Sequence, residues 1–375
     1  MKKKIIYLIL FLFSINFSLA AELLVDKQSS YKAEVIEIIS ETKEKLGGSE
    51  IDSPVQDIRI RILEGKDSGK EIILKNDFIQ LKDEQVFFLT ETIDGASGHV
   101  MYAVSDPYRL NVVYFFSALL FVLIIIFGGK QGIRGVVSLI LSLFLIVHVL
   151  LPNILVGHDA LLISISVASI IIIFGSYITH GFNFTTSSAV FGMIATVIVT
   201  GLLAYIATKM SMLTGFVEEE TMYLNFDTKG RIDFVGLLLG GMIIGLLGVL
   251  YDAAIGQAVA VEELCKAGPH LSRKEIYKRT LRIGREHIGA LINTLAIAYV
   301  GMSLPLLLLF SLSEASVFEI ANREIFATEI IRTLIGSIGL VLAVPITTFI
   351  ATIMLYGRKF KDSHTGHTHS YSHHH

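Results

Sequence analysis

The chain has 375 residues, of which 53% are hydrophobic and only 17% are charged. This balance predicts a multi-pass membrane protein and excludes an ordinary soluble domain. The net charge of -3 comes without a concentrated basic patch, so we expect no nucleic-acid partner. The single cysteine, Cys265, excludes an internal disulfide and a cysteine-based zinc site.

Residues 1–20 have the pattern of a secretory signal peptide. Three lysines precede an apolar core at residues 5–13, and small residues, Ser18 and Ala20, stand before the expected cut. An uncleaved first helix is the alternative. Either version predicts that the following segment is exported.

Residues 21–109 predict a small all-β domain of OB-like type outside the cytoplasm. Short alternating or β-branched runs occur at 32–39, 55–63, 70–75, 85–91 and 99–104. Turn clusters such as Gly47-Gly48 and Asp94-Gly95 separate them, which is typical of antiparallel strands.

Residues 110–357 predict an α-helical membrane bundle, since a span needs about 20 apolar residues. We expect seven spans, at 111–127, 133–151, 160–178, 186–208, 233–262, 288–312 and 329–356. Lys and Arg are concentrated in alternate loops, above all between 265 and 287, and these loops are expected in the cytoplasm. The tail at 358–375 is then cytoplasmic too. Ser272 and Glu275 form a capping-box pattern that predicts a helix start in the basic loop.

The fifth and sixth predicted spans form a hairpin that holds the candidate site. Asp252 lies among glycines that include Gly248 and Gly256, and glycine at such spacing lets helices pack closely in lipid. An ionisable group within an apolar span indicates a functional site. Helix geometry places Asp252 and Asn293 at similar depth, so a shared polar pocket is expected. Two acids further along, Glu262 and Glu263, are weaker candidates for the same pocket.

A purely structural interpretation of these residues stays open. Asp252 would then end the helix and pair with Arg285 or Arg282, while Asn293 would link two helices by a hydrogen bond. His287 would mark the membrane face beside Glu286.

Two segments of the hairpin resemble the YibE/F family of bacterial membrane proteins: GLLGVLYDAAIGQAVAVEEL at 245–264, and INTLAIAYVGMSLPLLLLF at 292–310 with IGRE at 283–286 before it. The predicted domain layout is similar as well, so the likeness covers nearly all of the mature chain. Residues matched to the family pattern are Gly245, Gly248, Asp252, Glu262, Glu263, Gly284, Arg285, Asn293, Thr294, Gly301, Ser303 and Pro305. The chain departs from that pattern at Tyr251 and at Gly256-Gln257, and it lacks a basic residue after His180.

The resemblance implies a transporter or permease in the bacterial plasma membrane, whose partners are the lipid bilayer and a small solute or ion. Protonation or cation binding at Asp252 would supply the coupling. A sensor or scaffold with a ligand-binding outer domain is the alternative. We expect no enzyme, because no His-Glu-x-x-His pair, membrane Gly-x-Ser-Gly or second acid facing Asp252 is evident. The number of protomers is left open, and a homo-oligomer is compatible with the sequence.

The tail adds a third alternative, a divalent-metal transporter, because histidine-rich tracts bind transition metals. No other cofactor is expected. The candidate metal ligands are His364, His367, His369, His373, His374 and His375.

Overall fold

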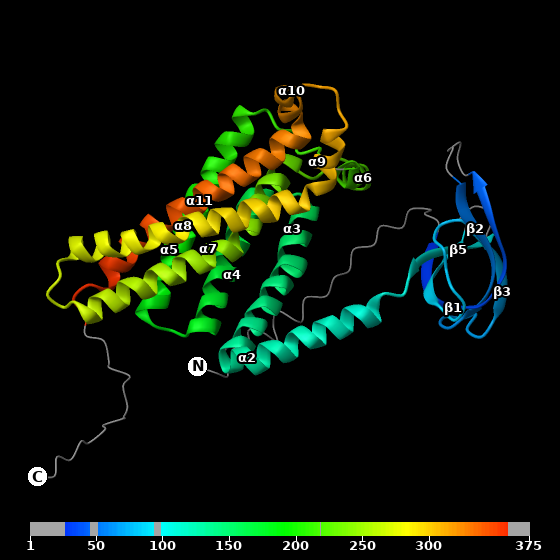
Figure 1. Ribbon diagram of the computed structural model, residues 1–375, viewed down its shortest axis with the longest axis horizontal. Coiled ribbons are helices and arrows are strands. Elements are labelled where there is room, and N and C mark those ends of the chain that lie inside the picture. Colours follow the sequence, from blue (N-terminus) through cyan, green and yellow to red (C-terminus); the bar gives the residue numbers. More distant parts are fainter. Residues whose placement is uncertain (1–26, 46–51, 94–98, 218, 359–375) are drawn as a thin grey trace, which may run out of the picture. The chain divides into compact units, whose positions relative to one another are not determined.

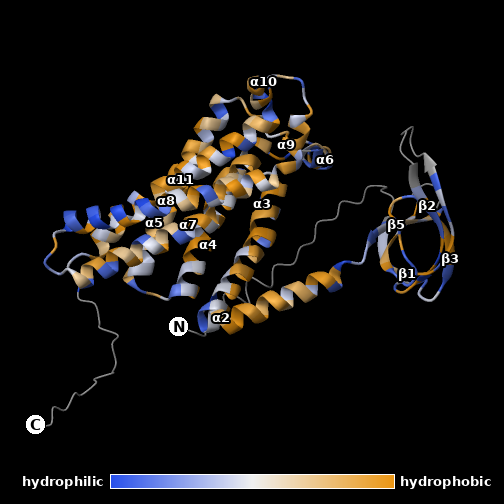
Figure 2. Cartoon of the chain, viewed as in Figure 1, coloured by the Kyte–Doolittle hydropathy of each residue, from blue (hydrophilic) through white to orange (hydrophobic). Residues whose placement is uncertain are grey.

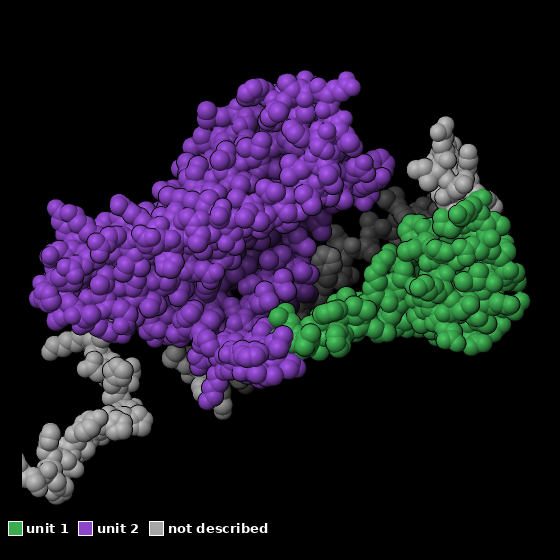
Figure 3. Space-filling model, viewed as in Figure 1, with its two compact units in different colours: residues 1–120 green, residues 121–375 purple. Residues whose placement is uncertain are grey.

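The computed structural model describes residues 27–45, 52–93, 99–217 and 219–358. The chain divides into two compact units, Met1–Leu120 and Phe121–His375 (Figure 3). The predicted signal peptide and the six tail histidines lie outside the described residues.

The first unit contains a five-stranded antiparallel sheet in the order β3-β2-β1-β4-β5. Its strands are β1 Lys27–Lys45, β2 Asp52–Ile62, β3 Glu71–Asn76, β4 Val86–Ile93 and β5 Val100–Pro107. The long strand β1 pairs with β4 along its first half and with β2 along its second, and two bulges in the β1–β2 register let it bend. The five predicted strands are therefore confirmed. The expected domain was a small barrel of OB-like type, and the described strands form a half-barrel whose edge strands, β3 and β5, approach without pairing.

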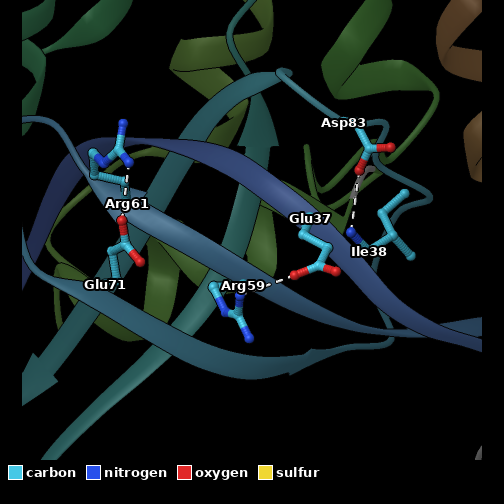
Figure 4. A network of polar contacts seen from close by, with 6 residues as sticks. All are labelled: Glu37, Ile38, Arg59, Arg61, Glu71 and Asp83. Carbon is cyan, nitrogen blue, oxygen red and sulfur yellow. Dashed lines mark hydrogen bonds and ion pairs between the residues drawn. The ribbon is translucent and has the colours of Figure 1, made fainter.

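The side chains of strand β2 show that one face of the sheet packs into a core and the other faces water. Its alternate side chains Ile58, Ile60 and Ile62 are buried against Phe87 and Leu89 of β4. The intervening arginines point outward and form ion pairs of 2.9 Å, Arg59 with Glu37 of β1 and Arg61 with Glu71 of β3 (Figure 4). Beside the bulges, the backbone N–H of Ile38 donates to Asp83 over 3.1 Å.

The second unit is a bundle of long apolar helices, and short helices lie at one end of it (Figures 1 and 2). Its elements, with α2 beginning in the first unit, are α2 Leu110–Leu145, the π-helix η1 Ile146–Leu150, α3 Leu151–Val156, α4 Ala160–His180, α5 Phe184–Met210, α6 Glu219–Asp227, α7 Phe234–Ala267, α8 Arg273–Met302, α9 Leu304–Ser311, α10 Val317–Asn322 and α11 Glu324–Leu355.

Among the described residues, five helices are long and apolar enough to cross a membrane, or six if the bent pair α8–α9 counts as one span. The prediction of seven differs because its first two spans fall within one 47-residue helical stretch, Leu110–Val156. At about 1.5 Å per residue a straight helix of this many residues would be about 70 Å long, more than twice the hydrocarbon core. Gly129, with φ 52° and ψ -139°, interrupts its helical backbone between the two predicted spans.

The capping box at the start of α8 is confirmed. The Ser272 side chain accepts from the Glu275 backbone, and the Glu275 carboxylate accepts from the Ser272 backbone N–H over 2.9 Å. From there α8 runs without a break through the basic segment into the sixth predicted span, which bends by 65° at Ser303 before α9.

The most extensive helix contact joins α5 and α11, which pack antiparallel through small residues. A Cβ placed on Gly192 of α5 would lie 2.9 Å from the Thr347 Cα of α11, and one on Gly339 of α11 would lie 2.9 Å from the Thr200 Cγ2 of α5. The two contacts are separated by eight residues on α5 and by eight residues on α11, so together they fix the register of the two helices. Since lipid gives no hydrophobic drive for association, this close backbone approach is what holds the pair.

Replacing Gly192 with alanine is expected to destabilise the bundle by about 1–3 kcal/mol, because the new methyl would meet backbone atoms that cannot move independently. The control is Gly241→Ala in α7, where a Cβ meets no atom within 4 Å. Thermal unfolding in detergent measures both. An unfolding temperature of Gly192→Ala at or above that of Gly241→Ala would contradict this packing.

Candidate functional site

One face of α7 carries almost no side chains. The exposed residues on this face are Gly241, Gly245, Gly248, Asp252 and Gly256. They recur at steps of three and four, which places them on one side of a helix. No atom lies within 4 Å of a Cβ built on Gly241, Gly248 or Gly256. Between Gly241 and Gly256 the face is therefore a shallow glycine stripe, and the Asp252 carboxylate is the ionisable group in this part of it.

Asp252 lies close to the middle of α7. It is about 27 Å from Phe234 and about 22 Å from Ala267 along the helix. Its side chain is exposed, and within the described part of the chain it makes no hydrogen bond or ion pair. The predicted alternative, a pair with Arg282 or Arg285, is not formed. A carboxylate at this depth of a membrane helix is costly unless water or a ligand reaches it.

A cavity of about 200 Å³ opens beside Asp252 between α7, α8 and α11. Its polar lining comes from the Asp252 carboxylate, the Gln257 amide and the His287 imidazole. Its remaining walls are Ala253, Gly256, Ile283, Leu291 and Val344. An acid, an amide and an imidazole around one small space can bind a proton, a cation or a small polar solute.

Gln257 fixes the wall of this cavity. It is 4% exposed, and the Thr348 hydroxyl of α11 lies 2.8 Å from its amide oxygen and 2.7 Å from the Val344 carbonyl oxygen, so the one hydroxyl proton is shared between these two acceptors. On the other side, a Cβ on Gly284 of α8 would lie 2.7 Å from the Gln257 Nε2. The absence of a side chain at Gly284 thus gives the amide its room, and α7, α8 and α11 meet at this group.

The other predicted residues lie elsewhere. Glu262, about 15 Å along α7 from Asp252, accepts from the Thr185 hydroxyl over 2.6 Å and pairs with Lys266 over 2.8 Å. It lines a separate cavity of about 130 Å³. Glu263 is exposed and also pairs with Lys266, over 2.9 Å.

Asn293 is exposed on α8 and is not part of the lining beside Asp252, so the structure does not bring these two predicted partners together. The reason is the direction in which the Asn293 side chain leaves the helix. Ile283, His287 and Leu291 follow at four-residue steps on the cavity face, whereas Asn293 is turned away from that face. Ser303 also lies apart, at the bend between α8 and α9.

Sequence reasoning left Gln257 out of the predicted site and placed His287 at the membrane edge. A signal for both was available. Gln257 is a polar residue five positions after Asp252 in an apolar run, and His287 shares a face of α8 with Ile283 and Leu291. The ion pair of Glu329 and Arg332 in α11 was missed as well, although two charges three residues apart in an apolar run stand out.

The sheet unit has a polar cavity of its own, of about 190 Å³. In it the Tyr102 hydroxyl lies 3.0 Å from Asp67 and 3.3 Å from Glu91. Burial, and after it the hydrogen bond to Asp67, raises the pKa of Tyr102 to about 12. The phenol therefore keeps its one proton at neutral pH and can donate it to only one of the two carboxylates at a time.

The long apolar helices make this chain a multi-pass membrane protein. A family model described as YibE/F-like protein matches residues 116–357, and the chain belongs to this family. The match includes the glycine stripe and the cavity beside Asp252, whereas the sheet unit precedes it, so it covers less of the chain than the sequence resemblance implied. No match was found among curated proteins or among solved structures.

The Gln257–Thr348 hydrogen bond is expected to couple α7 to α11. In a double-mutant cycle of Gln257→Leu and Thr348→Val, the two changes should show an interaction energy of about 0.6 kcal/mol, the usual size for such bonds in membranes. Reversible unfolding in mixed micelles measures it. Strictly additive costs would show that the contact contributes nothing.

Proposed function

We propose that this protein is a transporter or permease for a small solute or ion, with Asp252 as the group that binds a coupling proton or cation. The observation that carries the proposal is an unpartnered carboxylate, midway along an apolar helix, beside a cavity that also presents an amide and an imidazole. The role is that of a carrier, and no residue is given a catalytic part.

The charge of Asp252 is the physical basis of coupling. An ionised carboxylate at the centre of a membrane helix costs about 2.5–3.5 kcal/mol, and a bound proton or cation removes most of that cost. The loaded and empty states therefore differ in how well they tolerate lipid and close helix packing. A ligand shifts a conformational equilibrium only by such a difference, and the glycine stripe lets neighbouring helices close over the neutral form.

For the orientation we propose a bacterial plasma membrane with the sheet unit outside. Support comes from the end of the bundle where α7 ends, α8 begins and α11 ends. That end carries Lys266, Arg273, Lys274, Lys278, Arg279 and Arg358, and the first turns of α8 are the hydrophilic part of that helix in Figure 2. Loops rich in Lys and Arg stay in the cytoplasm.

Asp252→Asn keeps the shape of the side chain and removes its charge, so we expect proton- or cation-driven flux in proteoliposomes to fall at least about tenfold. A pH-sensitive dye inside the vesicles follows proton flux when candidate solutes or ions are supplied outside. Asp233→Asn is the matched control, because Asp233 is exposed at the start of the same helix and its side chain caps no N–H. Equal flux in both variants would remove Asp252 from the mechanism.

A sensor or scaffold is the second candidate, supported by the cavity around Tyr102. The two candidates differ in what removal of the sheet unit does. We expect a protein lacking residues 27–107, with its export signal kept, to retain the flux of the bundle within about threefold, since Asp252 and its cavity belong to the other unit. Loss of function in this protein, together with full function in Asp252→Asn, would favour the sensor.

Divalent-metal transport is the third candidate, and it is supported by the tail histidines alone. Within the described ranges, no three His, Cys, Asp or Glu side chains gather closely enough to hold a metal ion. Truncation before His364 should then change cellular tolerance to one divalent ion, and unchanged tolerance would count against this candidate.

A further inference from the structure

The bend between α8 and α9 exposes a second polar position in the membrane bundle. Ser303 closes α8 and starts α9, which turns away by 65°. Pro305 has no N–H to donate back into α8, so the helix cannot continue straight. Broken membrane helices of this kind are frequent where a ligand binds. The bend is 16 residues along α8 from His287, about 24 Å, and so is separate from the cavity beside Asp252.

Across from the bend, α11 carries an ion pair. Arg332 and Glu329 approach to 2.8 Å through the Glu329 Oε1, and both side chains are 22% exposed. Among the described residues, the second carboxylate oxygen, Oε2, accepts only from the Ser303 hydroxyl, at 3.4 Å. That distance is well beyond the usual O–H···O length of about 2.7–2.8 Å. Oε2 therefore keeps most of its capacity to accept a hydrogen bond.

A cavity of about 380 Å³ lies between the bend, α10 and α11. Glu329 is the one charged side chain among the described residues that line it. Most of the wall is apolar, with Leu306, Leu307, Phe310, Phe326, Ile330 and Leu334 as its main members. This volume falls in the range of small-molecule sites, which are about 300–1,000 Å³ and mostly apolar with a few polar groups.

We propose that this cavity binds an amphipathic organic cation, with an apolar body against the leucines and phenylalanines and a protonated amine on the Glu329 Oε2. An anionic head would meet the carboxylate and be repelled. A purely apolar molecule would leave Oε2 without a donor. An ammonium N–H instead forms a charge-assisted hydrogen bond against mostly apolar walls, where such bonds are strong. Binding does not require transport, so this inference stands or falls independently of Asp252.

The test uses the full chain in lipid nanodiscs and dansylcadaverine, a fluorescent apolar molecule with one primary amine. Fluorescence above that of empty nanodiscs reports binding. Octylammonium should displace the probe, while octanol and octanoate should do so at least about tenfold less well. Equal displacement by all three would overturn the proposal and show a pocket that takes any alkyl chain, including that of a bilayer lipid.

Glu329→Gln should weaken probe binding at least about tenfold. The control is Glu319→Gln in α10: the Glu319 side chain is exposed, and this change should leave the probe affinity within about twofold of the original. The first change leaves the Arg332 guanidinium without its ion-pair partner, which can destabilise the fold. The double variant Glu329→Gln, Arg332→Met removes both charges and so tests whether the weaker probe binding results from misfolding. It also should bind the probe weakly, with an unfolding temperature near that of the unaltered protein. Affinity within twofold of the original in both variants would overturn the proposal.

Discussion

The close contact of α5 with α11 is the constraint on which the membrane bundle depends. In lipid, apolar side chains gain no hydrophobic stabilisation when they move from the lipid to a neighbouring helix. Helices therefore associate through close backbone packing and through hydrogen bonds between them. Reciprocal glycine–threonine contacts, Gly192 with Thr347 and Thr200 with Gly339, fix both the distance and the register of this pair. The rest of α11 is positioned by that register, including Val344 and Thr348 at the cavity beside Asp252 and Glu329 at the bend of α8.

This arrangement leaves α7 with two different faces. One is buried against α4, α5 and α11 through residues such as Leu246, Leu250 and Ala254. The other is the glycine stripe, which is open except where α8 lies beside it. Tyr299 of α8 lines the cavity at the bend, and its hydroxyl would lie 3.1 Å from a Cβ on Gly245 of the stripe. The stripe thus leads from the unpartnered Asp252 toward the second cavity along the α7–α8 contact.

The sequence predicts the local features well and the three-dimensional partners poorly. Apolar runs, turn clusters and the Ser272–Glu275 box are local signals, and they gave the strands, the spans and the start of α8. The bend at Ser303 divides one predicted span into two helices, which hydropathy alone does not reveal, whereas the interruption at Gly129 falls between two predicted spans. Asp252 could be singled out because a charge in lipid is costly wherever it points. The residues that lie beside Asp252 could not be predicted in this way. Counting residues gives the depth of a side chain along its helix, but the direction in which that side chain points depends on how the helices are rotated against each other. Asn293 has the right depth and the wrong direction, and Gln257 and His287 were found only from the packing.

The central claim is that water or a ligand reaches Asp252 in the middle of the membrane. The native chain has one cysteine, so Cys265→Ser provides a background for single-cysteine labelling. Asp252→Cys should react with a small, charged, membrane-impermeant thiol reagent at least about tenfold faster than Ile198→Cys. Ile198 is the control because it is 53% exposed near the middle of α5, on a surface that lipid covers in this account. Equally slow labelling at both positions would mean that lipid or packed helices seal Asp252, and it would contradict the account.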